Sequence, residues 1–190
     1  MADEGEPRAA RKTRADAARN RARLLQVAKA AFAAKGPNAS LDEIARTAGV
    51  GAGTLYRHFP TRDALIEAVY LNETQQLADA AERLALSHPP VEALREWMRV
   101  FVDYIATKRM MAEALGSLAG GTSALYATST ALMTTALTSL VDRAVASGDI
   151  RLELDPMDLL RALAGVAGAG VKTEQNAMRL VDILIAGLRV

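Results

Sequence analysis

The chain has 190 residues, of which 51% are hydrophobic and 24% charged, and this is enough for one or two domains with a sizeable core. It contains no cysteine, which excludes a disulfide framework and suits a reducing compartment. The formal net charge of +1 hides an asymmetry, because residues 1–62 carry a net +6 and residues 63–190 a net −5. A basic N-terminal part favours nucleic-acid binding at that end, although charge clusters also occur on ordinary solvated surfaces.

The N-terminal segment is basic and polar, so we expect no secretory signal. The longest apolar run, residues 162–171, is far shorter than the ~20 residues of a membrane span. We therefore expect a cytoplasmic protein without a membrane partner.

Residues 1–19 lack bulky apolar anchors and are predicted to form a mobile basic arm. The arm could reach DNA phosphates or a minor groove, or it could merely aid solubility.

Residues 41–60 have the pattern of two short helices joined by a glycine turn. Ser40 and Glu43 have the spacing of a capping box, and Gly49 supplies the left-handed residue that ends a helix. In the second helix, Leu55 and Phe59 fall on one side. The opposite side carries the polar residues Thr54, Arg57 and His58. A short helix with an apolar inner side and a polar outer side suits the major groove of DNA, so the pattern predicts a helix-turn-helix.

A helix over residues 21–35 precedes this motif, and apolar residues at helical spacing continue after it. A helix opens at residues 60–61, and later breaks fall at residues 87–90, 120–121 and 148–149. A short helix is expected over about residues 108–118. The last three helices are expected over about residues 123–147, 155–171 and 174–189. We predict an all-α fold of about nine helices, with a DNA-binding domain over residues 20–68 and a second helical domain over residues 69–190.

The segments L-D-E-I-A-R-T-A-G-V, G-T-L-Y-R-H-F and T-R-D-A-L follow one another without a gap, and A-F-A-A-K-G precedes them. Over residues 20–70 the chain closely resembles the N-terminal DNA-binding domain of the TetR family of bacterial transcriptional regulators. The resemblance implies a second domain for ligand binding and dimerisation. It also implies DNA contacts from Leu41, Asp42, Gly51, Ala52, Gly53, Thr54, Tyr56, Arg57, His58 and Arg62.

Arg57 stands where many family members have an aromatic residue. Its guanidinium could read a guanine bidentately, worth roughly 1–3 kcal/mol of discrimination. It could equally hold a phosphate and contribute affinity alone.

The only histidines, His58 and His88, lack the spacing of metal ligands and the partners of a catalytic triad. The glycines of residues 49–53 follow a helix and lack the Gly-Lys-Ser/Thr of a phosphate-binding loop. We expect no catalytic residue, no metal and no cofactor.

In similar proteins the helix over about residues 108–118 and the helices before and after it surround an apolar cavity. Methionine and aromatic residues suit an irregular pocket, although each of them is also an ordinary core residue. The candidate pocket residues are Trp97, Met98, Phe101, Tyr104, Met110, Met111, Leu115, Tyr126, Met133 and Leu137.

The last two helices are predicted to pair two subunits, because residues 163–171 are rich in small side chains that allow close helix approach. The family resemblance also implies dimerisation here, while the alternative is that these residues form the core of one subunit. The candidate interface residues are Leu163, Val166, Gly170, Met178, Val181, Leu184, Ile185 and Leu188.

We therefore predict a homodimeric transcriptional repressor that binds a palindromic double-stranded DNA operator and is released by a small-molecule effector. One alternative is a ligand-independent DNA-binding or architectural protein, which a second domain without a cavity would favour. The other is an enzyme or carrier with a vestigial DNA-binding domain. Retention of Arg57, His58 and Arg62 argues against that reading.

Overall fold

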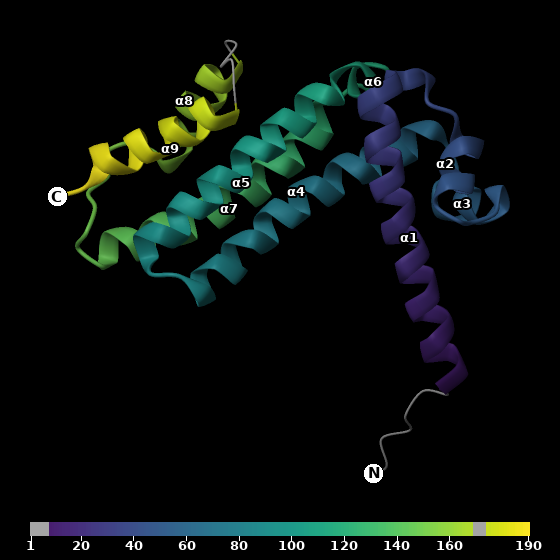
Figure 1. The fold of residues 1–190 in the computed structure, drawn as a ribbon, viewed down its shortest axis with the longest axis horizontal. Coiled ribbons are helices and arrows are strands. Elements are labelled where there is room, and N and C mark those ends of the chain that lie inside the picture. Colours follow the sequence, from purple (N-terminus) through teal and green to yellow (C-terminus); the bar gives the residue numbers. More distant parts are fainter. Residues whose placement is uncertain (1–7, 169–173) are drawn as a thin grey trace. The chain divides into compact units, whose positions relative to one another are not determined.

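The computed structural model describes residues 8–168 and 174–190, and within them it contains nine α-helices and no β-sheet (Figure 1). The prediction of an all-α fold is therefore confirmed. The helices are α1 (Arg8–Lys35), α2 (Leu41–Thr47), α3 (Ala52–His58), α4 (Arg62–Ser87), α5 (Pro90–Met110), α6 (Ala112–Gly116), α7 (Ser123–Ala146), α8 (Pro156–Gly168) and α9 (Glu174–Leu188). A short 3-10 helix, η1 (Gly36–Asn38), separates α1 from α2.

The chain divides into two compact units. The head unit comprises Met1–Val69 together with Met110–Gly121, and the helical unit comprises Tyr70–Arg109 together with Thr122–Val190. Helix α4 is continuous through the boundary, since its first eight residues lie in the head unit and the rest in the helical unit. The sequence did not predict that residues 110–121 belong with the head.

Helix α1 begins at Arg8, whereas the sequence suggested a start near Arg21 after a mobile arm of residues 1–19. The physical reason is composition, because alanine and arginine are strong helix formers even without an apolar stripe. Asp16 and Arg19 form an i,i+3 ion pair, and Asn20 accepts a hydrogen bond from Arg23. From residue 15 to residue 23 the side chains are exposed or half-buried, so this part of α1 is helical without being packed into a core.

The core of the head unit forms where α1, α2, α3 and the start of α4 meet. Its fully buried large side chains are Leu24, Leu25, Phe32, Ile44, Leu55, Leu65 and Ile66. The segment 110–121 also packs into this unit. A Cβ on Gly36 (φ +55°) would lie 2.7 Å from Oε2 of Glu113, and the amide of Ala119 donates to Oδ2 of Asp63 at 3.0 Å.

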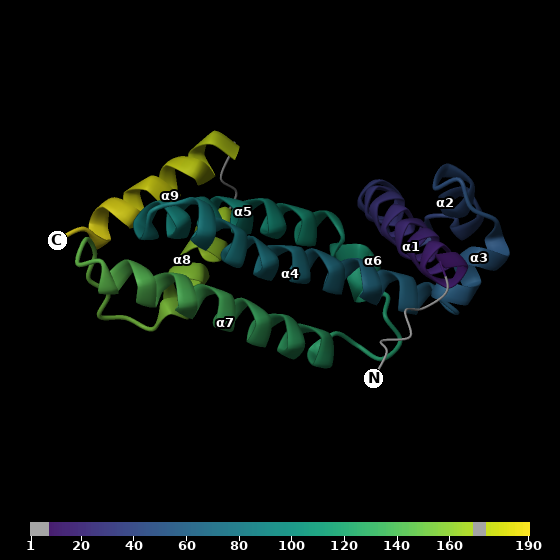
Figure 2. The same ribbon diagram turned by 90° about the horizontal axis from the view of Figure 1, so that it is seen from below.

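In the helical unit, α4, α5 and α7 run lengthwise side by side, with α5 in the opposite direction (Figures 1 and 2). A two-residue connection after Ser87 makes α4 and α5 antiparallel neighbours. Trp97 of α5 is fully buried, and its Nε1 donates to the carbonyl oxygen of Leu77 in α4 at 2.8 Å. This hydrogen bond satisfies the polar end of a large side chain that otherwise packs as an apolar group.

A chain of hydroxyl groups crosses the interior of the same three helices. Thr74 Oγ1 lies 3.2 Å from Ser129 Oγ and 3.3 Å from the hydroxyl of Tyr104, which donates to the hydroxyl of Tyr70 at 2.8 Å. Thr74 and Ser129 are fully buried, and burial raises the pKa of Tyr104. Because every buried hydroxyl here has a partner, this cluster fixes the lateral positions of α4, α5 and α7.

Most of the residues predicted to line an internal ligand pocket are packed into cores. Trp97, Met98, Phe101, Tyr104 and Leu137 are buried in the helical unit, whereas Tyr126 and Met133 are half-buried. Met111 and Leu115 are buried but belong to the head unit, and Met110 is 54% exposed. Three of the ten residues, Met110, Met111 and Leu115, therefore belong to the head unit, and the shared pocket stays a prediction.

Helix α9 is attached to α5 by apolar and charged contacts. Ala177, Val181 and Ile185 are buried, and Asp182 accepts a hydrogen bond from Arg99 at 2.9 Å. Near the C-terminus, the amide of Arg151 donates to the carbonyl oxygen of Leu188 at 2.8 Å.

Among the residues predicted for a dimer interface, Leu163, Val181 and Ile185 lie in the core of the subunit. Burial against neighbouring elements of the same subunit explains this difference from the prediction. Met178, Leu184 and Leu188 are half-buried, and Val166 is part of α8. Gly170 lies outside the described residues.

Helix α7 is the one described helix that is long and apolar enough to match a membrane span, but only 22% of its apolar window is buried. One such helix is weak evidence for a membrane span, because core helices pass the same test. Its exposed side includes small residues such as Ala124, Ala127 and Ala131. Consequently α7 presents small side chains to its surroundings along much of its length.

Candidate nucleic-acid interface

Helix α2 begins at the cap that the sequence predicted. The Oγ of Ser40 accepts a hydrogen bond from the amide of Glu43 at 3.3 Å. The carboxylate of Glu43 accepts a hydrogen bond from Nζ of Lys35 at 2.7 Å, so it ties α2 to the end of α1. The hydrogen bond and the charge of Lys35 lower the pKa of Glu43. The Ser40 half of the predicted capping box is therefore present. The side chain of Glu43 instead joins α2 to α1 through Lys35.

The turn between α2 and α3 depends on Gly49. Its φ is +68°, a conformation that strongly disfavours side chains with a Cβ. The amide of Gly49 donates to the carbonyl oxygen of Arg46 at 3.1 Å, and that of Val50 donates to Ala45 at 3.0 Å. These two bonds are those of a Schellman motif, which satisfies the last carbonyl groups of a helix. The glycine turn of the prediction is therefore confirmed.

The two sides of α3 differ sharply. Leu55 is fully buried, and Phe59, the residue that ends the helix, is 3% exposed. Tyr56 is 47% exposed although it is aromatic, and Arg57 beside it is also exposed. Residues 51–53 are exposed, while Thr54 and His58 are half-exposed at the edges of this side. Seven of the ten residues predicted to contact DNA, residues 51–54 and 56–58, are thus exposed or half-exposed along α3 and its cap.

The glycines on this surface have no function inside the fold. Gly51 has φ −72° and ψ 151°, an ordinary extended conformation, and Gly53 lies within the helix. A Cβ at either position would meet nothing within 4 Å. Glycine within a helix is less stable than alanine by roughly 0.5–1 kcal/mol, and no contact within the described subunit requires it at residue 53.

Arg62 has a structural contact that the sequence did not predict. Its Nη1 donates to the carbonyl oxygens of Pro37 and Ala39, at 2.8 and 2.6 Å. Arg62 therefore joins the first turn of α4 to the segment that precedes α2. Of the two residues predicted at the start of α2, Leu41 is half-buried and Asp42 is exposed.

The basic part of α1 is connected to α3 through Arg21. The guanidinium carbon of Arg21 lies 5.4 Å from the centroid of the Phe59 ring, which is a cation–π contact between the two helices. Arg23, two residues further along α1, is exposed. The head unit thus presents arginine side chains from α1 as well as from α3. No group of three possible metal-ligating residues occurs within the part of the chain that the structure describes.

Two family models match the chain. Residues 24–69 match the model described as bacterial regulatory proteins of the tetR family. Residues 89–190, more than half of the chain, match the C-terminal domain of SbtR-like transcriptional regulators. The chain belongs to the TetR family of transcriptional regulators. The helix-turn-helix of residues 41–60 is therefore the DNA-binding motif of a TetR-family protein.

Solved structures of the TetR family share the complete fold. A TetR transcriptional regulator from Streptomyces coelicolor is 46% identical, with a TM-score of 0.80, and the match covers 89% of this chain and 98% of that one. A TetR regulatory protein from Mycobacterium vanbaalenii is 38% identical, with a TM-score of 0.79, and the match covers 94% of this chain and 99% of that one. These matches include both the DNA-binding head and the helical unit.

A match to a repressor covers only part of the chain. The "Probable acrEF/envCD operon repressor" of Escherichia coli K12 is 34% identical over 100 residues. These residues are 51% of this chain and 46% of the repressor, so the chain spans about half of the length of that relative. The likeness therefore supports transcriptional regulation by a TetR-family protein, and it does not extend to a particular target or effector.

Proposed function

We propose that this regulator is a repressor that binds a palindromic operator as a homodimer and leaves it when a small molecule binds. The observation that carries the proposal is the exposed side of α3, where Gly51 and Gly53 have no internal function and lie beside the exposed Tyr56 and Arg57. A surface of glycine, hydroxyl and guanidinium groups on a helix with a buried apolar side suits the major groove of DNA.

In this proposal the glycines allow the backbone of α3 to approach the base edges. Arg57 and Tyr56 reach the phosphates or bases beside them, and Asp42 contacts the backbone from the start of α2. Arg62 takes a different part, since its Nη1 already binds two carbonyl groups of the head. Its remaining N–H groups are the ones that would meet a phosphate.

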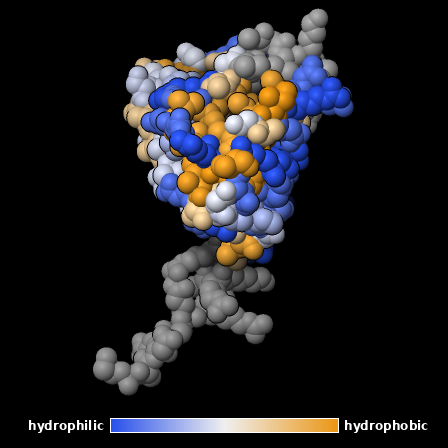
Figure 3. Space-filling view, turned by 90° about the vertical axis from the view of Figure 1, so that its left-hand side faces the viewer, coloured by the Kyte–Doolittle hydropathy of each residue, from blue (hydrophilic) through white to orange (hydrophobic). Residues whose placement is uncertain are grey.

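Two subunits would pair through the outward side of α9. The inward residues Val181 and Ile185 are already buried, whereas Ile183 is 64% exposed and Val190 is 89% exposed. Figure 3 shows apolar residues gathered on the end of the helical unit that carries the C-terminus. A symmetric pair would present two copies of α3 to half-sites about one helical turn, ~34 Å, apart.

Release by an effector would occur through a population shift between two spacings of the DNA-binding heads. A shift from 1:99 to 99:1 needs about 5.5 kcal/mol of differential binding, which one well-enclosed small molecule can supply. The protein would act in the cytoplasm, as a regulator of transcription and not as an enzyme.

A ligand-independent DNA-binding protein is the second candidate, because the interior of the helical unit is filled. Trp97, Met98 and Leu137 are completely buried where the sequence predicted a cavity. This candidate predicts the same operator binding without release by any small molecule. The two candidates therefore differ in a single measurable property, the effect of an added ligand on the affinity for DNA.

The deciding experiment is the selection of bound sequences from a random duplex library at ~0.1 M salt, where sequence-independent phosphate binding is weakened. We expect an enriched inverted repeat. Arg57→Ala should relax the preference at one base pair if Arg57 reads a base, or weaken binding to all sequences if it holds a phosphate. Arg83→Ala, which removes an exposed arginine of the helical unit, is the matched control and should change neither. Absence of any enriched repeat would refute the proposal.

A further inference from the structure

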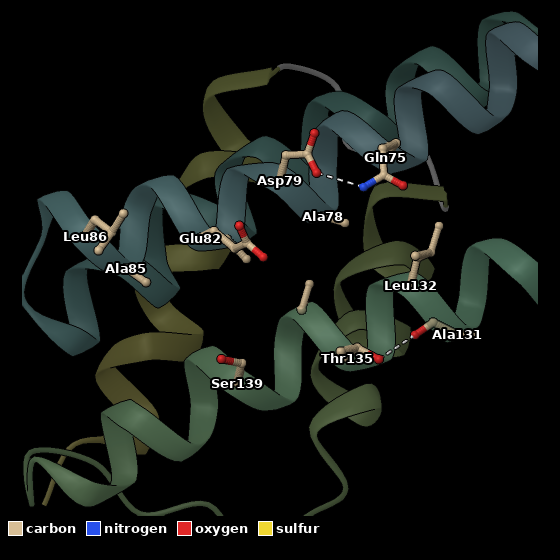
Figure 4. A pocket seen from close by; sticks show the side chains of 12 residues that line it. Gln75, Ala78, Asp79, Glu82, Ala85, Leu86, Ala131, Leu132, Thr135 and Ser139 are labelled. Atoms are coloured by element: carbon tan, nitrogen blue, oxygen red, sulfur yellow. Dashed lines mark hydrogen bonds between the residues drawn. The ribbon is translucent and has the colours of Figure 1, made fainter. Parts of the chain in front are cut away.

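A groove lies between α4 and α7 in the helical unit. Its volume is about 680 Å³, within the range of small-molecule sites. Figure 4 shows it as a channel with α4 along one wall and α7 along the other. The residues that line it are mainly small and apolar, and none of them belongs to the pocket predicted from the sequence.

The walls of the groove carry small side chains, which leave space between the two helices. Ala78 and Ala85 stand on the α4 wall, and Ala131 stands on the α7 wall. Helices with such small residues usually pack closely. Here the contact of Thr74 with Ser129 and the hydrogen bond of Trp97 to Leu77 hold α4 in place from the inner side. These two contacts tie α4 to α7 and to α5 beside the groove.

The charge of the groove has one sign. Asp79 and Glu82 line it from α4, and no lysine, arginine or histidine lines it. Asp79 accepts a hydrogen bond from Gln75 Nε2 at 2.7 Å, which leaves its charge in place because the amide is neutral. Glu82 has no hydrogen-bond or ion-pair partner within the described part of the chain, and Figure 4 shows its side chain directed between the two helices.

We propose that this groove binds a lipophilic cation, a small molecule with an apolar body and one positive charge. The apolar body would cover the alanines of both walls and bury surface that is now exposed. The positive charge would lie beside the carboxylates of Asp79 and Glu82, next to low-dielectric walls that strengthen the attraction. An anion of the same shape would be repelled by both carboxylates.

The site also deepens the proposed function, and its regulatory consequence rests on that function. Helix α4 begins in the head unit with Arg62 and lines the groove from residue 75 onward. A ligand placed between α4 and α7 acts on a helix that extends into both units. Binding that favours one position of α4 therefore changes the affinity of the protein for its operator.

Tetraphenylphosphonium and tetraphenylborate are the matched probes, since they share a shape and differ in charge. Titration calorimetry on the full chain should show the cation binding at least about tenfold more tightly than the anion, a difference of about 1.4 kcal/mol. Trp97 is the only tryptophan, and its emission should change because its indole is bonded to α4 directly behind the groove. Equal affinity for the two ions would overturn the proposal.

Single substitutions then locate the site. Glu82→Gln and Asp79→Asn should each weaken binding of the cation by about fivefold, because each removes one nearby charge. Glu67→Gln removes an exposed carboxylate from the same helix outside the groove and should leave binding unchanged. Ala78→Leu should abolish binding by filling the groove, and Ala131→Leu should do the same from the opposite wall if the first variant fails to fold.

Two further outcomes contradict the proposal. Retention of cation binding in a folded Ala78→Leu chain would place the cation elsewhere. A change of oligomeric state in that chain would assign the groove to a second copy of the protein. Operator selection on the unaltered chain keeps the tests separate. If the unaltered chain enriches an operator but binds no cation, only the proposed ligand site is refuted. If it binds the cation but enriches no operator, the repressor proposal is refuted.

Discussion

The head and the helical unit distribute polar groups in opposite ways. In the head, α3 buries Leu55 and directs Tyr56 and Arg57 outward. In the helical unit, hydroxyl groups such as Thr74 are fully buried, and alanines line an outer groove. A polar exposed side suits a charged, hydrated partner such as DNA. A surface of small apolar groups beside carboxylates suits a partner that brings both apolar area and positive charge.

The comparison also concerns rigidity. The head is held by apolar packing and by bonds between neighbouring segments, such as those of Arg62. In the helical unit, a chain of buried hydroxyl groups fixes three helices at once. The three helices are thereby tied together from the inside, and a groove of about 680 Å³ lies between α4 and α7. This difference suggests which substitutions should affect folding and which should affect binding.

The largest effect is expected for Leu55→Ala on the inner side of α3. Removing this fully buried side chain should lower the free energy of unfolding by roughly 2–5 kcal/mol, through lost burial and a new cavity. The neighbouring Tyr56→Ala should change stability little, because Tyr56 is largely exposed, and should instead weaken DNA binding. Urea unfolding followed by circular dichroism measures the first effect, and DNA titration the second. Similar stability losses for both variants would contradict the two-sided description of α3.

Arg62→Ala should destabilise the head in the absence of DNA. The substitution removes charged hydrogen bonds to two carbonyl groups, each worth roughly 1.5–3 kcal/mol, so we expect a loss of about 2 kcal/mol after partial compensation by water. Hydrogen exchange of the amides of α2 and α3 would detect it. Arg62→Lys is the charge-matched control and should restore only part of the stability. If Arg62 serves only to bind phosphate, the stability of the free protein will not change.

Much of the head could be predicted from the sequence, because its signals are local. The cap at Ser40 and the turn at Gly49 depend on residues within a few positions of one another. The start of α1 was missed because an exposed helix of alanine and arginine has no apolar period. The contacts of Arg62 and Glu113 were missed because they join residues far apart in the sequence.

The groove between α4 and α7 could not be predicted for the same reason. Alanines at residues 78, 85 and 131 look like ordinary helix-forming residues until α4 and α7 are placed side by side. The aromatic and methionine residues drew attention because large apolar side chains are typical of pockets. Large side chains fill space, however, and here they fill it completely. The groove is formed by the residues whose side chains are small.

Thr74→Val should test whether the hydroxyl cluster fixes the helical unit. The change keeps the shape of the side chain but leaves the hydroxyls of Ser129 and Tyr104 with fewer partners, so we expect a loss of roughly 1–3 kcal/mol. Thr135→Val is the matched control, because that hydroxyl is exposed and bonds only within its own helix. Thermal unfolding measures both. Equal melting temperatures would show that the cluster contributes little to stability.

Gly53→Ala should change stability and DNA binding in opposite directions. Alanine is the better helix former, and its Cβ meets nothing within 4 Å, so the head should gain up to about 1 kcal/mol. The same methyl group would hold α3 away from DNA and weaken operator binding. Gly165→Ala, at an equally open position in α8, should stabilise without affecting DNA binding. Unchanged operator affinity in Gly53→Ala would mean that the backbone of α3 does not approach DNA closely.

The smallest effect concerns the ion pair between Lys35 and Glu43 in the head. Because Lys35 lowers the pKa of Glu43 below its usual value of 4.5, the pair contributes stability above that value and loses it as the pH falls through the lowered pKa. Both side chains are about half exposed, so the contribution is small and weakens with added salt. Glu43→Gln should therefore be slightly less stable than the original chain at neutral pH. The two chains should be equally stable in acid, below the pKa of Glu43 in both the folded and the unfolded state. Unfolding measured from pH 3 to pH 7 tests this. A constant difference across that range would mean that the hydrogen bond matters and the charge does not.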